Sequence, residues 1–371
     1  MNQIDKQKIL SISIPTWNRD ILLQELLVNI TEQIAKHHLE DKIDVYVSDN
    51  DSNDTTKAVV HSFMERCSYM SYHKNDSNIG LGPNVTQSML LANGKYTLLL
   101  GDDDRLKSDC LPSLITYLEQ HPDTGLLVDT TDAKKGKVEN ITNLSLEQFL
   151  KTYYWFMGNA GVFVTLTSYT KDNFGDPKIK GVSFSWPQTQ LMIIGSYKNP
   201  QNKIMVGNFN LIGGTEHANI TLYNSYYLWK VSYYELVVDI ENLRDVVSKE
   251  VVGAGRQYFI DDATQKFFNV LQCGVYLDSN ENKKKTRDHI SKHLGVFSAK
   301  EQRLLKIILF VLWLPAPIAR ILSDVFIFLI RGKAGLEKKN NFVKQEKKKM
   351  EIINSKKKTI IRQFSFEGAP S

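Results

Sequence analysis

The stretch of sequence that decides the fold is LSISIPTWNRD at residues 10–20. Its first half is a short run of apolar and β-branched residues, which is typical of a buried strand. The polar residues PTWNR follow, and residues 20–36 then place apolar side chains at the spacing of one helix face. A strand, a polar turn and an amphipathic helix in this order form the first half of a βαβ unit.

The same alternation continues along the chain as far as residue 120. Short apolar runs and helical patterns follow one another at residues 43–47 (IDVYV), about 54–66, 70–72, 83–94, 96–100 (YTLLL) and 110–120. Strands that alternate with helices at this spacing are joined by right-handed crossovers, which produce a mostly parallel sheet with helices on both faces. The predicted fold class is therefore α/β.

Polar clusters follow four of the predicted strands, at the point where each strand ends. Ligands of parallel sheets bind outside the carboxyl ends of the strands, so we expect these four loops to converge on one crevice. The clusters are Pro15-Thr16-Trp17-Asn18-Arg19, Ser48-Asp49-Asn50-Asp51, residues 75–84 and Gly101-Asp102-Asp103-Asp104.

Asp102, Asp103 and Asp104 form a run of three adjacent carboxylates. Because like charges repel, a fold that gathers them at a strand end needs a compensating cation or must let them point into water. Oxygen ligands suit Mg²⁺ or Mn²⁺, which typically take one or two carboxylates together with a diphosphate and water. The alternative is a solvated turn in which one Asp caps the helix that follows.

Asp49 ends the second predicted strand at the same edge of the sheet. A carboxylate there can accept a hydrogen bond from a nucleobase imide or a ribose hydroxyl, and a turn stabilised by its own side chain is the alternative. The loop of residues 15–19 offers a rigid turn, an aromatic face at Trp17 and a cation at Arg19 for phosphate, or else a simple helix entry.

Asn78, Gly80 and Asn84 lie in a polar loop that leads into a helix, a geometry that can present backbone amides to an anion. We assign these three residues to nucleotide binding. The loop is neither a GxxxxGK[ST] phosphate loop nor a GxGxxG fingerprint, so ATPases and dinucleotide-dependent oxidoreductases lose support as function classes.

In order and spacing these motifs resemble the nucleotide-binding half of family 2 glycosyltransferases, and within that family the abequosyltransferase-like branch of bacterial surface polysaccharide biosynthesis (O-antigen or capsule). The resemblance covers residues 9 to about 125. The motifs that carry it are ISIPTWNR (12–19), VSDNDSND (47–54), NIG (78–80) followed by Asn84, ANGKY (92–96) and LLGDDDRL (99–106).

The resemblance implies a GT-A fold, with a nucleotide-binding half at residues 1–125 and an acceptor-binding half at 126–260. It implies that the loop of residues 15–19 and Asp49 hold the nucleoside, with Trp17 where the family often has Tyr. Asp102 and Asp103 would lie at the ribose and diphosphate. Asp104, with Asp102 as the second candidate, would bind Mn²⁺ or Mg²⁺.

Single-displacement transfer to a hydroxyl also needs a general base, which removes the acceptor proton. Many relatives carry an acidic pair in the second half, but residues 181–188 (GVSFSWPQ) contain no carboxylate. Asp176, Glu216 and His217 remain as candidates, and we favour Glu216 and His217, with an ordinary surface role as the alternative. The triplet Trp186-Pro187-Gln188 is expected either to line the acceptor pocket or to form a turn with a packed Trp.

The 371 residues are 42% hydrophobic and 23% charged, which is typical of a globular chain. The net charge of +5 is unevenly distributed, because residues 331–371 hold 12 Lys or Arg and 4 Asp or Glu, whereas residues 1–330 are slightly acidic. The 3 scattered cysteines argue against a disulfide framework or a thiolate zinc site. With no apolar leader at the N-terminus, we expect a cytoplasmic protein.

Residues 304–330 are strongly apolar and exceed the ~20 residues that a membrane-spanning helix needs. Three charged residues and two prolines interrupt the stretch, namely Lys306, Arg320, Asp324, Pro315 and Pro317. Two amphipathic helices in the membrane interface, with Trp313 at headgroup depth and the Lys-rich tail on anionic lipid, fit this pattern better. A buried helix pair and a spanning hairpin are the alternatives.

The sequence therefore predicts a metal-dependent inverting glycosyltransferase on the inner face of the cell membrane. Its donor is a nucleotide-diphosphate sugar and its acceptor a saccharide, in particular a lipid-linked oligosaccharide. Residues 261–331 are assigned to a C-terminal helical, membrane-associating region and 332–371 to a Lys-rich tail.

Two rival functions belong to other classes. A sugar nucleotidyltransferase would be expected to carry a Gly-rich loop after the first strand, and residues 15–19 contain no Gly. A non-catalytic, membrane-tethered saccharide-binding module stays open because the acidic pair is missing. Nucleic acid is not an expected partner, since the basic residues are not interleaved with aromatic ones.

Overall fold

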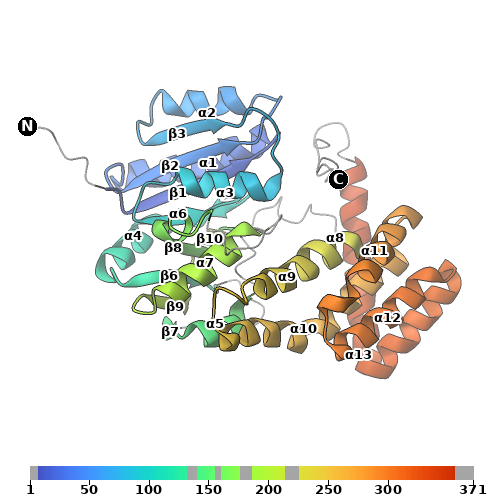
Figure 1. Cartoon of the computed structure of the whole chain (residues 1–371). Coiled ribbons are helices and arrows are strands. Elements are labelled where there is room, and N and C mark those ends of the chain that lie inside the picture. Colours follow the sequence, from blue (N-terminus) through green and yellow to red (C-terminus); the bar gives the residue numbers. More distant parts are fainter. Residues whose placement is uncertain (1–6, 132–139, 155–159, 176–185, 214–224, 356–371) are drawn as a thin grey trace, which may run out of the picture. The chain divides into compact units, whose positions relative to one another are not determined.

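The computed structural model describes residues 7–131, 140–154, 160–175, 186–213 and 225–355 (Figure 1). They pack as two compact units. The described part of the first unit falls within residues 1–218 and 239–255, and that of the second within 219–238 and 256–363.

The first unit is built on a mixed, mostly parallel sheet, as the sequence predicted. Within the described residues its eight strands lie in the order β3 (Met70–Lys74), β2 (Ile43–Asp49), β1 (Leu10–Thr16), β4 (Tyr96–Leu99), β8 (Phe163–Leu166), β6 (Thr124–Asp129), β9 (Lys203–Gly207) and β7 (Thr142–Leu144). Only β8 and β7 run antiparallel to their neighbours.

Helices cover both faces of this sheet. α1 (Asp20–Lys36), α2 (Thr56–Met64) and α4 (Cys110–Gln120) share one buried core with the strands. α3 (Leu81–Leu91), α6 (Thr167–Lys171) and α7 (Pro187–Lys198) contact one another and lie in front of the sheet in Figure 1, with α5 (Leu146–Tyr153) against α7. The bounds of α1 and α4 are those expected from the sequence, because their apolar residues keep the helical period throughout.

The register of the central strands brings the carboxyl ends of three of them together. β1 lies between β2 and β4, and Thr16 at its end is opposite Asp49, the last residue of β2. The residues that follow β4 emerge at the same edge, where β5 (Arg105–Leu106) pairs antiparallel with β10 (Ile212–Gly213). This edge is where the sequence places its polar clusters.

The second unit is helical in its described residues. Its elements are α8 (Ser225–Trp229), a π-helical turn (Lys230–Tyr234), α9 (Glu235–Asn242), α10 (Lys249–Tyr276), α11 (Asn280–His293), a 3₁₀ turn (Leu294–Val296), α12 (Ala299–Trp313) and α13 (Ala316–Ser355), of which α9 and α10 also contribute to the first unit. Aromatic rings fill its core, with Trp229 5.2 Å from Phe297 and Tyr233 4.8 Å from Phe267 between ring centroids.

The apolar stretch of residues 304–330 forms two helices that are separated at the prolines, as expected. None of the helices within the described ranges is long and apolar enough to cross a membrane. The Lys-rich segment, which the sequence analysis treats as a tail, is helical up to Ser355. α13 turns sharply at Gly332, and Lys339 beyond the turn lies 2.8 Å from Asp324 and is almost buried.

Candidate active site

The run of three carboxylates follows β4, and the loop after β1 closes on its first member. Thr16 donates a hydrogen bond from Oγ1 to Asp102 Oδ2 at 2.8 Å, and Arg19 Nη1 lies 2.5 Å from Asp102 Oδ1. Asp102 is 4% exposed, so both of its oxygens are held inside the protein. The pairing is possible because β1 and β4 are neighbours in the sheet.

Electrostatics at this pair are governed by burial and by the adjacent carboxylates. Burial raises the pKa of Asp102, while the Arg19 cation and the Thr16 hydroxyl partly oppose that shift. Burial alone would lower the pKa of Arg19, but the carboxylates of Asp102 and Asp103 outweigh it and the pKa is raised. Arg19 is therefore a permanent positive charge at the edge of the sheet.

Asp103 and Asp104 are less completely compensated. Asp103 Oδ2 lies 3.4 Å from Arg19 Nη1 and a third of its side chain is exposed. Asp104 Oδ2 accepts a hydrogen bond from the Gly101 amide at 2.9 Å, and burial together with the charge of Asp103 raises its pKa to about 7. Excess negative charge of this kind is what a divalent cation relieves.

The donor set fits Mg²⁺ or Mn²⁺ completed by a substrate. Across the described ranges, no group of three or more His, Cys, Asp or Glu residues is arranged to hold a metal by protein ligands alone. Mg²⁺ is usually bound through one or two carboxylates and completed by phosphate oxygens and water, and Asp103 and Asp104 supply that number. A metal at this site would therefore depend on a diphosphate for its remaining ligands.

Gly161, which no sequence motif indicates, lies next to the side chain of Asp104. Its backbone φ is +77°, and a Cβ at this position would lie 3.1 Å from Asp104 Oδ2 and 2.6 Å from Ile212 Cδ1. The Gly161 amide donates to the Leu99 carbonyl at 2.7 Å. Only glycine fits this close approach, and nothing in the local sequence indicates it.

Asp49 is fully buried at the end of β2 and both of its oxygens are engaged. Oδ1 accepts a hydrogen bond from the Ser52 amide at 2.8 Å, and Oδ2 accepts one from the Tyr72 hydroxyl at 2.5 Å. The turn given as the alternative is thus present. A carboxylate oxygen can accept a second hydrogen bond, so a role toward a nucleobase stays a prediction.

No sequence motif identifies Tyr72 as a site residue, although the apolar run at residues 70–72 contains it. Burial and the hydrogen bond to Asp49 raise the pKa of Tyr72, which keeps its hydroxyl a donor. Its position in β3 opposite Val47 follows from the strand pairing and not from any local motif.

The loop around Asn78, Gly80 and Asn84 is held by side-chain amides. Asn84 is buried and accepts hydrogen bonds from Ser48 Oγ at 2.8 Å and from Asn75 Nδ2 at 2.9 Å. Asn78 Oδ1 accepts from the Gly80 amide, whose residue has a φ of 91°. These three residues shape the loop, and their predicted contact with a nucleotide stays a prediction.

Hydrogen bonds connect the loop after β1 to the loop after β2. Pro15 and Thr16 are the last residues of β1, and Trp17 is half-buried. Asn18 has a φ of 52°, its amide donates to Ser52 Oγ at 2.8 Å, and its Oδ1 accepts from the Asn53 amide at 2.9 Å. Asn18 therefore links two loops. It does not cap α1, since the N-terminus of α1 has no side-chain capping hydrogen bond.

The candidates for the general base, Glu216 and His217, lie outside the described residues, as does Asp176. The last described residue before Glu216 and His217, Gly213, pairs with Arg105, which directly follows Asp104. Of the triplet at 186–188, Pro187 begins α7 and Gln188 is buried within it, so the segment forms a helix start.

Two buried carboxylates that the sequence analysis did not single out have structural partners. Asp129, at the end of β6, accepts hydrogen bonds from the Phe209 amide at 3.0 Å and from the Leu211 amide at 2.7 Å. Asp239 accepts from Thr189 Oγ1 at 3.2 Å and Gln190 Nε2 at 3.0 Å. Asp129 holds the segment that leads into β10, next to the carboxylate run.

Comparison with known proteins identifies a relationship in the N-terminal part of the chain. Residues 11–175 match the family described as glycosyl transferase family 2. The chain is 37% identical over 116 residues to abequosyltransferase RfbV of Salmonella typhimurium, which is 31% of this chain and 34% of that protein. It is 34% identical over 108 residues to GalNAc(5)-diNAcBac-PP-undecaprenol beta-1,3-glucosyltransferase of Campylobacter jejuni, which is 29% of this chain and 33% of that protein. The matches thus span about a third of these curated relatives.

Solved structures show a likeness over more of the chain. TarS of S. aureus matches with a TM-score of 0.54 at 14% identity, over 85% of this chain and 54% of that chain. Its residues 1–349 in complex with UDP-GlcNAc match with a TM-score of 0.52, over 81% of this chain and 90% of that chain. At this identity the likeness shows the fold alone, and it confirms a GT-A-like α/β sheet followed by a helical region.

Proposed function

Because residues 11–175 belong to glycosyl transferase family 2, we propose that this protein transfers a sugar from a nucleotide-diphosphate donor to a hydroxyl of a growing saccharide. The observation that carries the proposal is the carboxylate run at the end of β4. Arg19 lies 2.5 Å from Asp102 and 3.4 Å from Asp103, so one cation faces three adjacent carboxylates and negative charge remains in excess.

In this proposal Asp104 holds Mn²⁺ or Mg²⁺, with Asp103 as the second carboxylate. Asp102 is the weaker choice for a ligand because Thr16 and Arg19 already occupy its two oxygens. The bound cation supplies charge that offsets the negative charge developing on the leaving diphosphate. Arg19 adds a fixed positive charge at the same edge, and its anchoring to Asp102 keeps it in place.

Asp49 and the loop of residues 15–19 hold the nucleoside in this proposal. An imide base such as uracil or thymine presents an N–H that Asp49 can accept, provided that the base reaches the buried carboxylate. TarS, a protein of similar fold, has been solved in complex with UDP-GlcNAc, which is a uridine donor. Trp17, which is half-buried, offers its remaining face for stacking.

The acceptor is proposed to be a lipid-linked oligosaccharide of a bacterial cell-surface polysaccharide. Support comes from the Campylobacter jejuni relative, whose name describes a glycan on PP-undecaprenol. Attack of the acceptor hydroxyl opposite the leaving group inverts the anomeric centre, and Glu216 or His217 serves as the base that takes its proton. Inversion and the identity of the base both rest on the sequence.

The test is a thermal-shift panel of nucleoside diphosphates and nucleotide sugars with and without Mn²⁺, followed by an assay of donor turnover. Specific binding raises the apparent stability by RT ln(1 + [L]/Kd), so the nucleotide that gives the largest shift identifies the nucleobase of the donor. We expect Asp104→Asn to lower turnover by about two orders of magnitude and Asp103→Asn to lower it less. Asp123→Asn is the matched control, because Asp123 is an exposed carboxylate outside the run that pairs with Lys203.

Two results would reject the proposal. One is nucleotide binding that neither depends on Mn²⁺ nor changes in Asp104→Asn. The other is metal-dependent binding of a nucleotide sugar without turnover of any donor in the presence of saccharide acceptors. The second result would favour the non-catalytic binding module, which the missing carboxylate in residues 181–188 leaves open.

A further inference from the structure

Large apolar side chains are exposed in one short part of the second unit. Across the described ranges, nine of the sixteen exposed large hydrophobic residues lie between Ile307 and Leu329, and the other seven are scattered from Ile21 to Tyr197. Single exposed apolar residues are ordinary, whereas a contiguous group marks an interaction surface. We call the nine residues the apolar stripe and describe them helix by helix.

On α13 the apolar stripe follows one helix face. Its six members are Ile318, Ile321, Leu322, Val325, Phe328 and Leu329. Spacings of three, four and seven residues place them side by side over about 17 Å of helix at 1.5 Å per residue. The opposite face carries Ala319, Ser323 and Ile327, which are buried in the unit. The helix therefore already has a packed inner side, and its second apolar side faces outward.

On α12 the apolar stripe continues with Ile307, Phe310 and Trp313, of which Trp313 is 71% exposed. Arg303 and Lys306 precede Phe310 by seven and four residues, so they lie on the same outward face. The inner face again is packed, with Leu305 and Ile308 among its buried residues. An indole beside cations and aliphatic side chains is the combination found at the boundary of a lipid headgroup layer.

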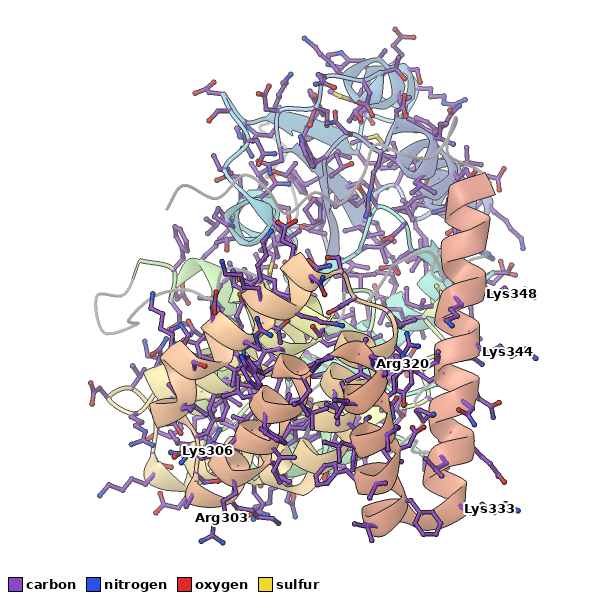
Figure 2. All side chains as sticks on the ribbon, turned by 90° about the vertical axis from the view of Figure 1, so that its right-hand side faces the viewer. Arg303, Lys306, Arg320, Lys333, Lys344 and Lys348 are labelled. Carbon is purple, nitrogen blue, oxygen red and sulfur yellow. The ribbon has the colours of Figure 1, made fainter. Side chains whose placement is uncertain are left out.

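Exposed positive charge is found on the same two helices, both within the apolar stripe and beyond the turn at Gly332. Figure 2 shows Arg303 and Lys306 on α12, Arg320 on the first part of α13, and Lys333, Lys344 and Lys348 along its second part, and all six side chains are exposed. Of the acidic groups on the two helices, Glu301 and Asp324 are paired with Arg256 and Lys339, and Glu337 beyond the turn of α13 is exposed among more numerous cations. A second copy of the chain would bring like charge against like charge, whereas an anionic surface complements it.

We propose that the apolar stripe of α12 and α13 is a docking surface for an anionic lipid bilayer, with both helices lying in the plane of the interface. Their packed inner faces keep them attached to the unit while the outer faces enter the headgroup region. This inference does not rest on the proposed function.

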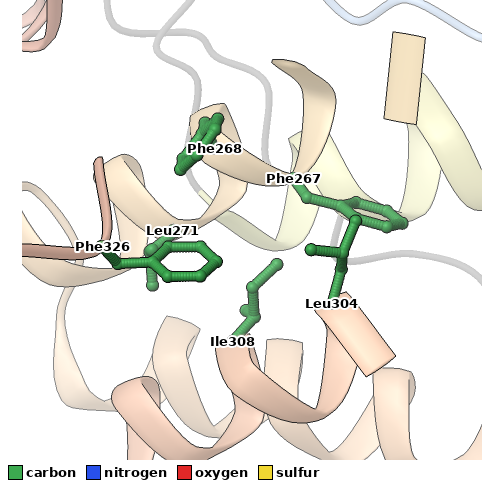
Figure 3. A pocket seen from close by; sticks show the side chains of 6 residues that line it. All are labelled: Phe267, Phe268, Leu271, Leu304, Ile308 and Phe326. Carbon is green, nitrogen blue, oxygen red and sulfur yellow. The ribbon is translucent and has the colours of Figure 1, made fainter. Parts of the chain in front are cut away.

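Docking takes place on the surface and not in a cavity. The hollow behind the stripe is lined by Phe267, Phe268, Leu271, Leu304, Ile308 and Phe326 (Figure 3). Its volume of ≈ 10 Å³ is about what one water molecule needs, so it has no room for an acyl chain.

The test is co-sedimentation of the full chain with vesicles of phosphatidylcholine alone and with vesicles that also contain phosphatidylglycerol. We expect binding to the mixed vesicles, and we expect added salt to weaken it. Phe328→Glu is expected to lower this binding by at least about tenfold, because it places a charge in the apolar face. Phe174→Glu, at an exposed Phe of the first unit, is the matched control and should bind as the wild type does.

A second variant tests the charge separately. The double variant Arg303→Gln with Lys306→Gln should weaken binding by about thirtyfold, because each cation near an anionic lipid surface raises the affinity by about fivefold. All variants should unfold at the wild-type temperature, because the substituted side chains are exposed.

Three outcomes would overturn the proposal. They are equal or absent binding to both kinds of vesicle, wild-type binding by Phe328→Glu, and an oligomeric state in light scattering that Phe328→Glu changes while vesicle binding stays the same. The last would identify the apolar stripe as an interface between copies of the chain. None of these measurements uses glycosyl transfer, so a failure of the proposed function would be seen separately.

Discussion

Arg19 and Asp102 are 83 residues apart in the sequence and 2.5 Å apart between Nη1 and Oδ1. Their side chains are only 18% and 6% exposed, so the ion pair is largely removed from water. It joins the loop after β1 to the loop after β4, and the Arg19 cation is closest to Asp102, with a longer contact of 3.4 Å to Asp103. The arrangement leaves Asp103 and Asp104, and not Asp102, as the residues that need an external cation.

Removing the cation of this pair should be costly. Arg19→Met leaves Asp102 buried without its counter-charge, and we expect the free energy of unfolding to fall by about 3 kcal/mol, measured by urea denaturation. The control is Lys42→Met, which breaks an exposed pair with Glu119 and should cost less than about 1 kcal/mol. Adding Asp102→Asn to Arg19→Met should recover part of the loss. Equal costs for the two single variants would show that Asp102 does not depend on Arg19.

The nucleotide-binding half of the fold was predictable because its signals are local. Leu10, Ile12 and Ile14 are fully buried, as a short apolar run predicts, and α1 keeps its period over its whole length. The apolar run predicts that the first strand ends at Ile14, whereas β1 runs to Thr16. The missed end is polar, and the parallel register with β2 stabilises it, which no pattern along one strand reveals.

The candidate site was predictable only in part, because only some of its residues have a local signal in the sequence. The three carboxylates are adjacent in the sequence and are visible without a structure. Tyr72 and Gly161 were not, because their contacts with Asp49 and Asp104 come from strands and loops that meet only in the folded chain. In the second unit, residues 304–330 form helices that are apolar on both the buried and the exposed face. The spacing of apolar residues therefore does not distinguish the buried Ile308 from the exposed Ile307.

Asp49 gives a prediction that separates stability from nucleotide binding. Asp49→Ala leaves the Ser52 amide and the Tyr72 hydroxyl without their acceptor, and we expect a loss of about 2 kcal/mol in the free energy of unfolding. Under the proposed function it also weakens nucleotide binding at least about tenfold, measured by titration calorimetry.

A matched control for Asp49→Ala lies on the same strand. Asp44 is a buried carboxylate that accepts a hydrogen bond from Tyr46 at 3.3 Å, near the opposite end of β2. Asp44→Ala should leave nucleotide affinity unchanged. If both variants, or neither, lost affinity, Asp49 would have no specific role toward the nucleotide.

Gly332 predicts a local effect of backbone geometry. Its φ of 62° and ψ of −162° lie in a region that essentially only glycine adopts, so Gly332→Ala should cost about 1 to 3 kcal/mol, measured by chemical denaturation. The contact between Lys339 and Asp324 should be lost if the helix straightens instead. Gly253→Ala is the control, because Gly253 lies in α10 with open space around it and should gain up to about 1 kcal/mol. A neutral Gly332→Ala would exclude the sharp turn.

His289 predicts how the stability of the second unit depends on pH. Trp229 Nε1 donates to His289 Nδ1 at 3.0 Å, which requires that nitrogen to be unprotonated. Burial, with nearby His293 and Lys230, lowers the pKa of His289 to about 4. Between pH 4 and 6.5 the unfolded chain therefore binds more protons, so the stabilisation is complete above pH 6.5 and up to about 3 kcal/mol is lost as the pH falls to 4. Asp278, whose pKa burial raises to about 6, acts in the opposite sense, so the quantity to measure is the difference in unfolding free energy between wild type and His289→Gln. That difference should grow with pH across this window, and a difference independent of pH would contradict the assignment.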